Sequence, residues 1–323
     1  MTTTMMLEQI RALPKAELHL HIEGTLEPDL AFALAKRNDI NLRFPTVAAL
    51  AQAYDFADLR SFLNLYYECM AVLLHPADFA DLANAYLERA ARDGVRHVEM
   101  FFDPQAHTSR GVALDDVVAG LRSAVLEAPA RHGVSAALIA CFVRDRPVAE
   151  AMRTLEALSE HLDVIQAVGL DSAEVGNPPG AFREVFEAAA QLGLRKVAHA
   201  GEEGPPEYVW EALDVLGVER IDHGIRAVED GALLRRLAAD LVPLTVCPLS
   251  NVRLRCVDSL EHHPLPQLLD AGVLVTINSD DPAYFGGYVA ENYHALQQAL
   301  GLDMSTLKAL ARNSLAASFG KAG

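Results

Sequence analysis

The sequence predicts an α/β fold, a (β/α)8 TIM barrel with a helical insertion after the first strand. Short apolar segments recur along the chain with helical stretches between them, and most segments lack the period-two alternation of strands with one solvated face. Eight such segments in a chain of this length are typical of a barrel whose strands are covered by helices. A doubly wound open sheet is the alternative, but no Gly-x-Gly-x-x-Gly motif follows the first strand. The predicted strands are Ala16–His21, His97–Phe102, Ala136–Val143, Val164–Asp171, Lys196–His199, Arg220–His223, Leu244–Cys247 and Leu274–Asp280.

The connection between the first two predicted strands, residues 24–96, is unusually long. A helical excursion at one end of a barrel can act as a lid that excludes water from a site, although it can equally be a structural addition. The helices expected in this insertion are Asp29–Arg37, Val47–Ala53, Leu59–Leu74 and Ala77–Asp93. After the eighth strand, Glu291–Gln298 and Ser305–Leu315 are expected to be closing helices.

Composition and charge indicate a globular protein that does not bind polyanions. Of the 323 residues, 51% are hydrophobic and 22% are charged, and no linker or internal repeat divides them. We therefore expect one domain over residues 1–323. The net charge of −17 disfavours nucleic acid and anionic membranes as partners, and it suits a small neutral or cationic ligand better.

Cysteine usage and apolar runs indicate where the protein resides. The four cysteines form no Cys-x-x-Cys pair, which is typical of reduced thiols in a cytosol. The N-terminus lacks the pattern of a signal peptide, and no apolar run reaches the roughly 20 residues that span a bilayer. We expect a soluble cytoplasmic protein, and the sequence leaves open whether it forms a homo-oligomer.

The fifth predicted strand is followed by a group of polar residues. After His199 come Gly201, Glu202 and Glu203, and a double proline then begins a helix whose apolar stripe ends at Gly217. His199 and Glu202 are thus expected at a junction between a strand and a helix. In α/β folds, sites are built at such junctions.

Further histidines and carboxylates occupy the ends of other predicted strands. His19 and His21 end the first strand, His223 ends the sixth, and Asp280 and Asp281 are at the end of the eighth. Because the carboxyl ends of barrel strands share one face, we expect these side chains to lie near the end of the fifth strand. The alternation of side chains along a strand places both imidazoles of the first pair on the same side.

Three histidines and an aspartate, together with a water molecule, form a suitable shell for a catalytic metal ion. His19, His21, His199 and Asp280 supply this set, and zinc is the default metal for such ligands. Bound zinc lowers the pKa of water from 15.7 to about 7. The histidine pair also fits a structural role, and Asp280 also fits the cap of a turn.

Glu202 and His223 are the candidate acid–base groups. Glu202 lies three residues after His199 and can donate or accept a proton beside a metal. His223 can orient an attacking hydroxide, and hydrogen-bonded packing is its alternative role. Glu99, Asp103 and His107, near the second strand, can line the pocket, but a solvated loop is the favoured role for them. His262 and His263 are expected at the surface.

Five segments in order along the chain carry most of these polar residues. They are AELHLHIEGT (16–25), AHAGE (198–202), IDHG (221–224), CPLSN (247–251) and NSDDP (278–282). This set, over almost the whole chain, resembles the motifs of the adenosine and AMP deaminase family. Within it the chain is most similar to the branch that acts on the free base adenine, and the supporting segments are FDPQ (102–105), GLDS (169–172) and AYFGG (283–287).

The resemblance implies an activity and a role for each site residue. It implies a hydrolase of purine salvage, with one zinc ion on the four candidate ligands, that converts adenine and water to hypoxanthine and ammonia. Glu202 protonates a ring nitrogen of the purine, and His223 stabilises or deprotonates the attacking oxygen. Asp281 forms a hydrogen bond to the ring on its five-membered side.

The resemblance also implies substrate contacts for Glu23, Gly24 and Glu174. Glu23 stands where the nucleoside enzymes usually have an aspartate that contacts ribose, and its extra methylene intrudes on that space. Glu174 stands where those enzymes have a glycine whose backbone meets the ring. Both changes predict a smaller pocket that favours the free base.

Three alternatives remain open. One is a deaminase of adenosine, of an N6-substituted adenine or of another 6-aminopurine. Another is a different metal-dependent hydrolase, although the segment Gly169–Ser172 lacks the lysine of many two-metal sites, which favours a mononuclear centre. The third is a non-catalytic purine-binding protein.

Overall fold

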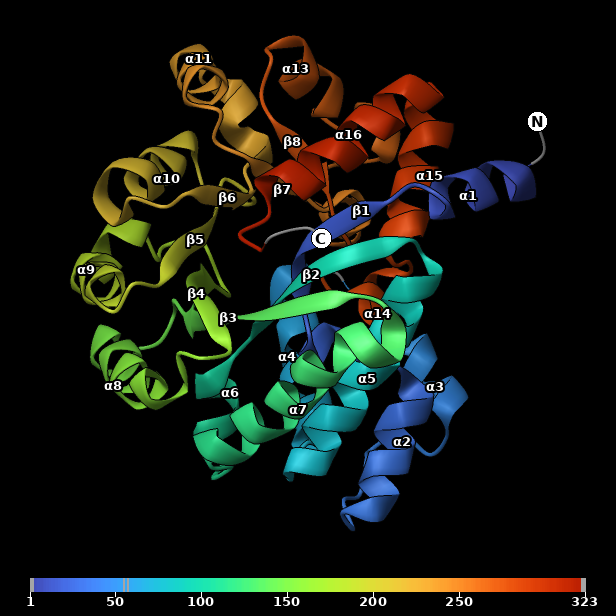
Figure 1. The fold of residues 1–323 in the computed structure, drawn as a ribbon, viewed down its shortest axis with the longest axis vertical. Coiled ribbons are helices and arrows are strands. Elements are labelled where there is room, and N and C mark those ends of the chain that lie inside the picture. Colours follow the sequence, from blue (N-terminus) through green and yellow to red (C-terminus); the bar gives the residue numbers. More distant parts are fainter. Residues whose placement is uncertain (1–2, 55, 57, 321–323) are drawn as a thin grey trace.

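The computed structural model describes residues 3–54, 56 and 58–320, and a barrel of eight parallel strands forms its centre (Figure 1). Each strand pairs with the next one along the chain. The last strand also meets the first, because the N–H of His21 donates to the carbonyl of Asp280 at 3.0 Å and the N–H of Asp280 donates to the carbonyl of His19 at 3.1 Å. The predicted barrel is confirmed. Its strands are β1 (Lys15–His21), β2 (Val95–Phe102), β3 (Ser135–Val143), β4 (Ile165–Asp171), β5 (Arg195–Ala200), β6 (Arg220–His223), β7 (Leu244–Val246) and β8 (Val275–Ile277).

The strands lie where the apolar segments predicted them. Every residue of β1 and β6 is buried, as expected for strands that face the barrel interior on one side and a layer of helices on the other. The eighth strand is shorter than predicted and ends at Ile277. Asp280 has a φ of 63°, so the chain has left the extended conformation before this residue.

Helices form the outer layer of the barrel (Figure 1). Three short helices, α6, α12 and α14, begin with a proline directly after a strand end, where the missing N–H is not needed. Helix α1 was not predicted, and its Arg11 contacts Glu291 of α15 at 3.1 Å. The helices outside the insertion are α1 (Thr3–Arg11), α6 (Pro104–Thr108), α7 (Leu114–His132), α8 (Val148–Leu158), α9 (Arg183–Gln191), α10 (Pro206–Glu211), α11 (Gly231–Asp240), α12 (Pro248–Arg253), α13 (Leu265–Asp270), α14 (Pro282–Phe285), α15 (Val289–Leu300) and α16 (Met304–Ala317).

The insertion forms the helices α2 (Pro28–Arg37), α3 (Val47–Gln52), α4 (Leu59–Cys69) and α5 (Pro76–Arg92), which gather on one side of the barrel (Figure 1). The helix predicted to run to Leu74 ends at Cys69, and a 3-10 turn follows it. Aromatic rings attach α4 to α14, since Phe62 lies 4.7 Å from Phe285 between ring centroids. In the described part of the chain, no helix is both long and apolar enough to cross a membrane.

A buried ion pair fills the barrel near the amino ends of its strands. The guanidinium of Arg220 donates to Glu99 at 2.7 Å and to the carbonyl of Leu18 at 3.1 Å, and Phe319 packs over the guanidinium. His97 also contacts Glu99, at 3.3 Å. The expectation that Glu99 is solvated is wrong, because this carboxylate is the partner of a fully buried cation.

Candidate active site

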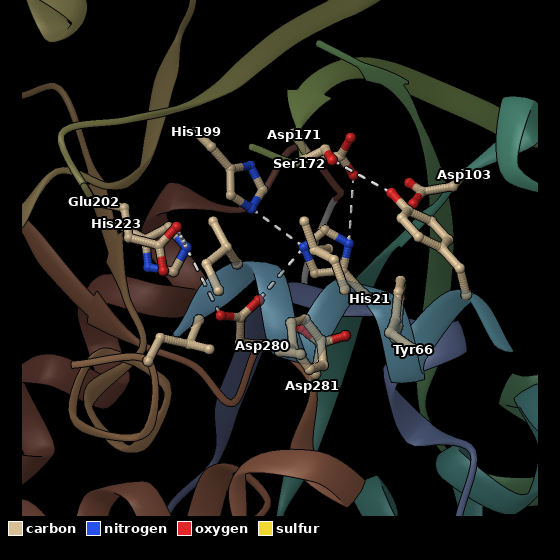
Figure 2. Close-up of a pocket in the computed structure, with 15 residues that line it drawn as sticks. His21, Tyr66, Asp103, Asp171, Ser172, His199, Glu202, His223, Asp280 and Asp281 are labelled. Atoms are coloured by element: carbon tan, nitrogen blue, oxygen red, sulfur yellow. Dashed lines mark hydrogen bonds and ion pairs between the residues drawn. The ribbon is translucent and has the colours of Figure 1, made fainter. Parts of the chain in front are cut away.

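A cavity opens at the carboxyl ends of the strands, beneath helix α4 (Figure 2). Figure 2 shows Glu202 and His223 on one side of it, Asp103 and Asp171 on the other, and His21, His199 and Asp280 between them. Polar residues from the strand ends thus face apolar and aromatic side chains of the insertion. The lining residues are His21, Leu59, Phe62, Leu63, Tyr66, Tyr67, Asp103, Asp171, Ser172, His199, Glu202, His223, Leu254, Asp280 and Asp281.

The four candidate metal ligands converge at the floor of this cavity. One ligand atom from each of His19, His21, His199 and Asp280 lies within 4.8 Å of all the others. The Nε2 atoms of His21 and His199 are 3.2 Å apart, and Oδ1 of Asp280 lies 3.2 Å from Nε2 of His19. Nε2 of His19 is buried and has no hydrogen-bond partner among the described residues. A set of three imidazole nitrogens and one carboxylate oxygen therefore fits a divalent metal such as zinc.

The second nitrogen of each imidazole faces an acceptor. Nδ1 of His19 lies 3.1 Å from the carbonyl of Thr245, and Nδ1 of His199 lies 3.7 Å from Asp222. Nδ1 of His21 lies 3.6 Å from Asp171. Such partners fix the ring orientation and leave Nε2 free for a metal. Thr245, Asp171 and Asp222 were not predictable as partners, since nothing in their spacing along the sequence shows which histidine each of them contacts.

Glu202 and His223 lie next to one another at the edge of the cluster. Oε2 of Glu202 is 3.5 Å from Nε2 of His223, which lies 3.7 Å from Oδ2 of Asp280. Burial and the negative charge of Asp280 hold the pKa of Glu202 well above its usual range. Burial, together with the nearby His19, lowers the pKa of His223 to about 3. Both shifts favour the uncharged form of the group, a carboxyl group on Glu202 and a neutral imidazole on His223.

Comparison with known proteins identifies the family. A family model described as adenosine deaminase matches residues 14–323. The chain belongs to the adenosine deaminase family. The protein is thus a hydrolytic deaminase of a metal-dependent family, and its barrel is the fold of its relatives.

Adenine deaminases are among the proteins that are similar to this chain. The adenine deaminase of Streptomyces coelicolor is 65% identical, with 97% of this chain and 92% of the relative covered. The solved structure of the adenine deaminase from Arthrobacter aurescens is 55% identical with a TM-score of 0.95, and covers 96% of this chain and 95% of that one. An amidohydrolase from Burkholderia ambifaria, solved with bound Zn, is 28% identical with a TM-score of 0.88, covering 97% and 87% of the two chains.

Asp281 of this deaminase family member lines the cavity beside the metal ligands. Its Oδ1 is buried with no hydrogen-bond partner in the described residues. Burial and the adjacent Asp280 hold the pKa of Asp281 well above its usual range. A Cβ at position 24 would come within 2.0 Å of this Oδ1 atom, so Gly24 allows the carboxyl group its place. Gly24 itself is not among the residues found to line the cavity.

Glu23 and Glu174 are not among the described residues that line the cavity, and their carboxylates accept hydrogen bonds from protein groups. Their contacts with a substrate stay a prediction. Oε1 of Glu23 accepts the N–H of Asp103 at 3.1 Å and a hydrogen bond from Nε2 of His107 at 2.7 Å. The carboxylate of Glu174 accepts hydrogen bonds from the backbone N–H groups of Gly201 and Glu202, which follow β5. Side-chain length at a matched position does not reveal such local partners.

Several residues expected in solvated loops are buried. Asp103 lines the cavity and His107 binds Glu23, so both lie inside the protein. His263 is also buried and contacts Oδ1 of Asn251 at 3.3 Å, whereas His262 is exposed as expected. Burial raises the pKa of Asp171, which faces Asp103 across the cavity end, to about 7. Asp103 directly follows β2 and Asp171 ends β4, and this position at a strand end is a signal in the sequence that could have found these two residues.

Proposed function

We propose that this protein catalyses the zinc-dependent hydrolytic deamination of adenine to hypoxanthine and ammonia. The observation that carries the proposal is the convergence of a candidate metal-ligand set, Glu202 and the buried Asp281 on one cavity. The adenine deaminases at 65% and 55% identity support the choice of the free base as substrate.

His19, His21, His199 and Asp280 are the residues proposed to hold the zinc ion. Bound there, zinc would lower the pKa of a water molecule to about 7 and would act as a Lewis acid. The buried, unpartnered Nε2 of His19 and the short approach of His21 to His199 support this assignment.

The remaining groups move protons and orient the base. Glu202 donates its proton to a ring nitrogen, which makes the adjacent carbon more electrophilic toward water. The neutral imidazole of His223 takes up a proton from the attacking oxygen, since its Nε2 faces the cavity beside Asp280. Asp281 forms a hydrogen bond to the five-membered ring. The proton taken up by His223 then passes to the amino group, which leaves as ammonia when the carbon–nitrogen bond breaks. The ring keeps the oxygen, and the remaining hydroxyl proton returns to Glu202.

Residues 1–323 are proposed to act as one domain, with the insertion at 24–96 as a lid. Phe62 and Tyr66 of α4 cover the cavity and come from a segment that is attached to the barrel by side chains. Opening of such a cover would admit the purine, and closure would exclude bulk water from the reacting carbon.

The test is a parallel assay of the purified, zinc-loaded protein with adenine, adenosine and N6-methyladenine, following ammonia release and ultraviolet absorbance. We expect adenine to be turned over with a kcat/KM at least about 100-fold above that of adenosine, because the closed cavity has to reject a whole ribose. A preference for adenosine or the methylated base would show that adenine is not the preferred substrate, while the reaction would still be a hydrolytic deamination. No turnover of any of the three would contradict the proposed function.

A further inference from the structure

The carboxylate of Glu174 accepts hydrogen bonds from the backbone N–H groups of four consecutive residues. Oε1 accepts from Gly201 at 2.7 Å, and Oε2 accepts from Glu202, Glu203 and Gly204 at 3.0, 2.9 and 2.8 Å. The side chain is 1% exposed, so water does not compete for these bonds. Successive N–H groups that surround an anion in this way form a nest, and the charge of the acceptor strengthens each bond.

The backbone of residues 201–204 is shaped to fit this carboxylate. Gly201 has a φ of +73°, which lets the chain turn directly after β5. A Cβ on Gly204 would lie 2.5 Å from Oε1 of Glu174, so a larger residue would force the carboxylate away. On the other side of the segment, the N–H of Arg226 donates to the carbonyl of Gly201 at 2.9 Å, and its guanidinium donates to the carbonyl of Glu203 at 2.5 Å.

Glu202 lies in the middle of this segment, and its side chain points into the cavity toward His223 (Figure 2). We propose that Glu174 is a positioning residue that holds the carboxyl group of Glu202 in place for proton transfer. Glu174 is not one of the described residues that line the cavity. It therefore acts only through the backbone that carries Glu202. This inference rests on the proposed function of Glu202 as the proton donor.

Loss of the carboxylate leaves the segment without its acceptors. In Glu174→Gln, one oxygen remains, and an amide group that donates hydrogen bonds faces N–H groups that also donate. The segment then relaxes, and displacement of a catalytic group by about 1 Å costs on the order of 100-fold in rate. The metal ligands lie outside residues 201–204, and zinc binding is therefore expected to survive.

The experiment compares Glu174→Gln, Glu202→Gln and the double variant with the wild type, with Glu203→Gln as the matched control. Glu203→Gln removes a neighbouring charge and keeps all four hydrogen bonds to Glu174. We expect Glu174→Gln to lower kcat for adenine by about 10- to 100-fold, with zinc content and the Kd for hypoxanthine unchanged. Glu203→Gln should stay within about threefold of the wild type, and the double variant should be no slower than Glu202→Gln alone.

A purely structural role gives a different result. A kcat of Glu174→Gln within twofold of the wild type, or losses that multiply in the double variant, would overturn the inference. If the glutamine variant does not fold, Glu174→Asp keeps the charge on a shorter side chain and should show an intermediate kcat; a wild-type kcat in this variant would count against positioning.

A crystal structure of the variant tests the inference without any activity. The distance between Oε2 of Glu202 and Nε2 of His223, 3.5 Å in the wild type, should lengthen in the glutamine variant. An unchanged distance would overturn positioning by Glu174. Failure of the wild type to deaminate adenine would instead contradict the proposed function, and this structural comparison would still decide the role of Glu174.

Discussion

His223 and Asp280 share a backbone conformation that is uncommon for residues with a Cβ. Both have a φ of 63°, in the left-handed region. Each such residue costs roughly 1 kcal/mol, which the surrounding structure has to offset. At Asp280 this cost is offset by backbone hydrogen bonds to His19 and His21. At His223 it is offset by the pairing of β6 with β5. This conformation occurs at the last residue of β6 and shortly after the end of β8, where the side chains of His223 and Asp280 enter the cavity.

Replacement of the proton donor should separate chemistry from binding. Glu202→Gln keeps the size of the side chain and removes the proton that the raised pKa favours. We expect kcat for adenine to fall by roughly 10²- to 10⁴-fold while one zinc per chain and the Kd for hypoxanthine are kept. Steady-state kinetics and metal analysis check this. Near-normal turnover would show that another group donates the proton.

The carboxylate of Asp222 should control metal affinity. It lies 3.7 Å from Nδ1 of His199 and accepts a hydrogen bond from Thr245 at 2.8 Å. Asp222→Asn removes the charge that orients the imidazole, and we expect about 10- to 100-fold weaker zinc binding. Competition with a chromogenic chelator measures the affinity, and excess zinc should restore turnover. An unchanged zinc affinity would contradict this role.

Helix α4 brings the insertion to the site through aromatic and hydroxyl contacts. Phe62 lies 5.6 Å from Tyr284 between ring centroids, and the hydroxyl of Tyr67 lies 3.3 Å from the hydroxyl of Ser172, which directly follows β4. The aromatic contacts hold the helix on the barrel, whereas the hydroxyl pair joins the helix to the cavity wall. A lid that opens would have to break the hydroxyl pair first, because it is the smaller interaction.

Removal of this hydroxyl pair should weaken closure of the lid. Tyr67→Phe loses a hydrogen bond worth about 1 kcal/mol, which corresponds to a roughly fivefold rise in KM for adenine if closure contributes to binding. The melting temperature should change little. Ser172→Ala should have the same effect, and the double variant should be no worse than either single variant. An unchanged KM in all three variants would show that α4 is a fixed part of the cavity wall and not a lid.

The elements differ in how far the sequence predicts them. The β1 histidines were predictable because alternation along one strand places both side chains on the same side, and the eight strands were predictable because burial on both faces makes them apolar. The position of α4 above the cavity was not predictable, since periodicity defines the buried face of a helix and not its partner. For the same reason the protein partners of Glu23 and Glu174 were not predictable: they are backbone N–H groups and a histidine distant in the chain.

The barrel as a whole depends on the buried pair of Glu99 and Arg220. Arg220 and nearby His97 lower the pKa of Glu99 to about 2, against 4.5 for a free glutamate, although burial alone acts in the opposite direction. The unfolded chain therefore binds the proton more tightly than the folded one. The stabilisation is fully present above pH 4.5 and is lost as the pH falls toward 2.

Acid unfolding should report this pair. The pKa difference corresponds to roughly 3 kcal/mol of unfolding free energy, lost between these two pH values. Glu99→Gln should lower stability at pH 7 by roughly 3 to 5 kcal/mol, because Arg220 is left buried without its anion. Its unfolding free energy should also fall less steeply with acid than that of the wild type. Urea unfolding at several pH values measures both, and equal acid slopes would contradict the assignment.

The seam between β8 and β1 has a consequence for biosynthesis. Residues on either side of the seam are far apart in the chain, as in the hydrogen bond between Leu18 and Asn278, which are separated by 260 positions. The same seam joins the backbone of Asp280 to that of His19 and His21. During synthesis His19 and His21 therefore emerge long before Asp280. A nascent chain that has not yet reached Asp280 lacks one of the four candidate ligands, so the complete set forms only when the seam closes.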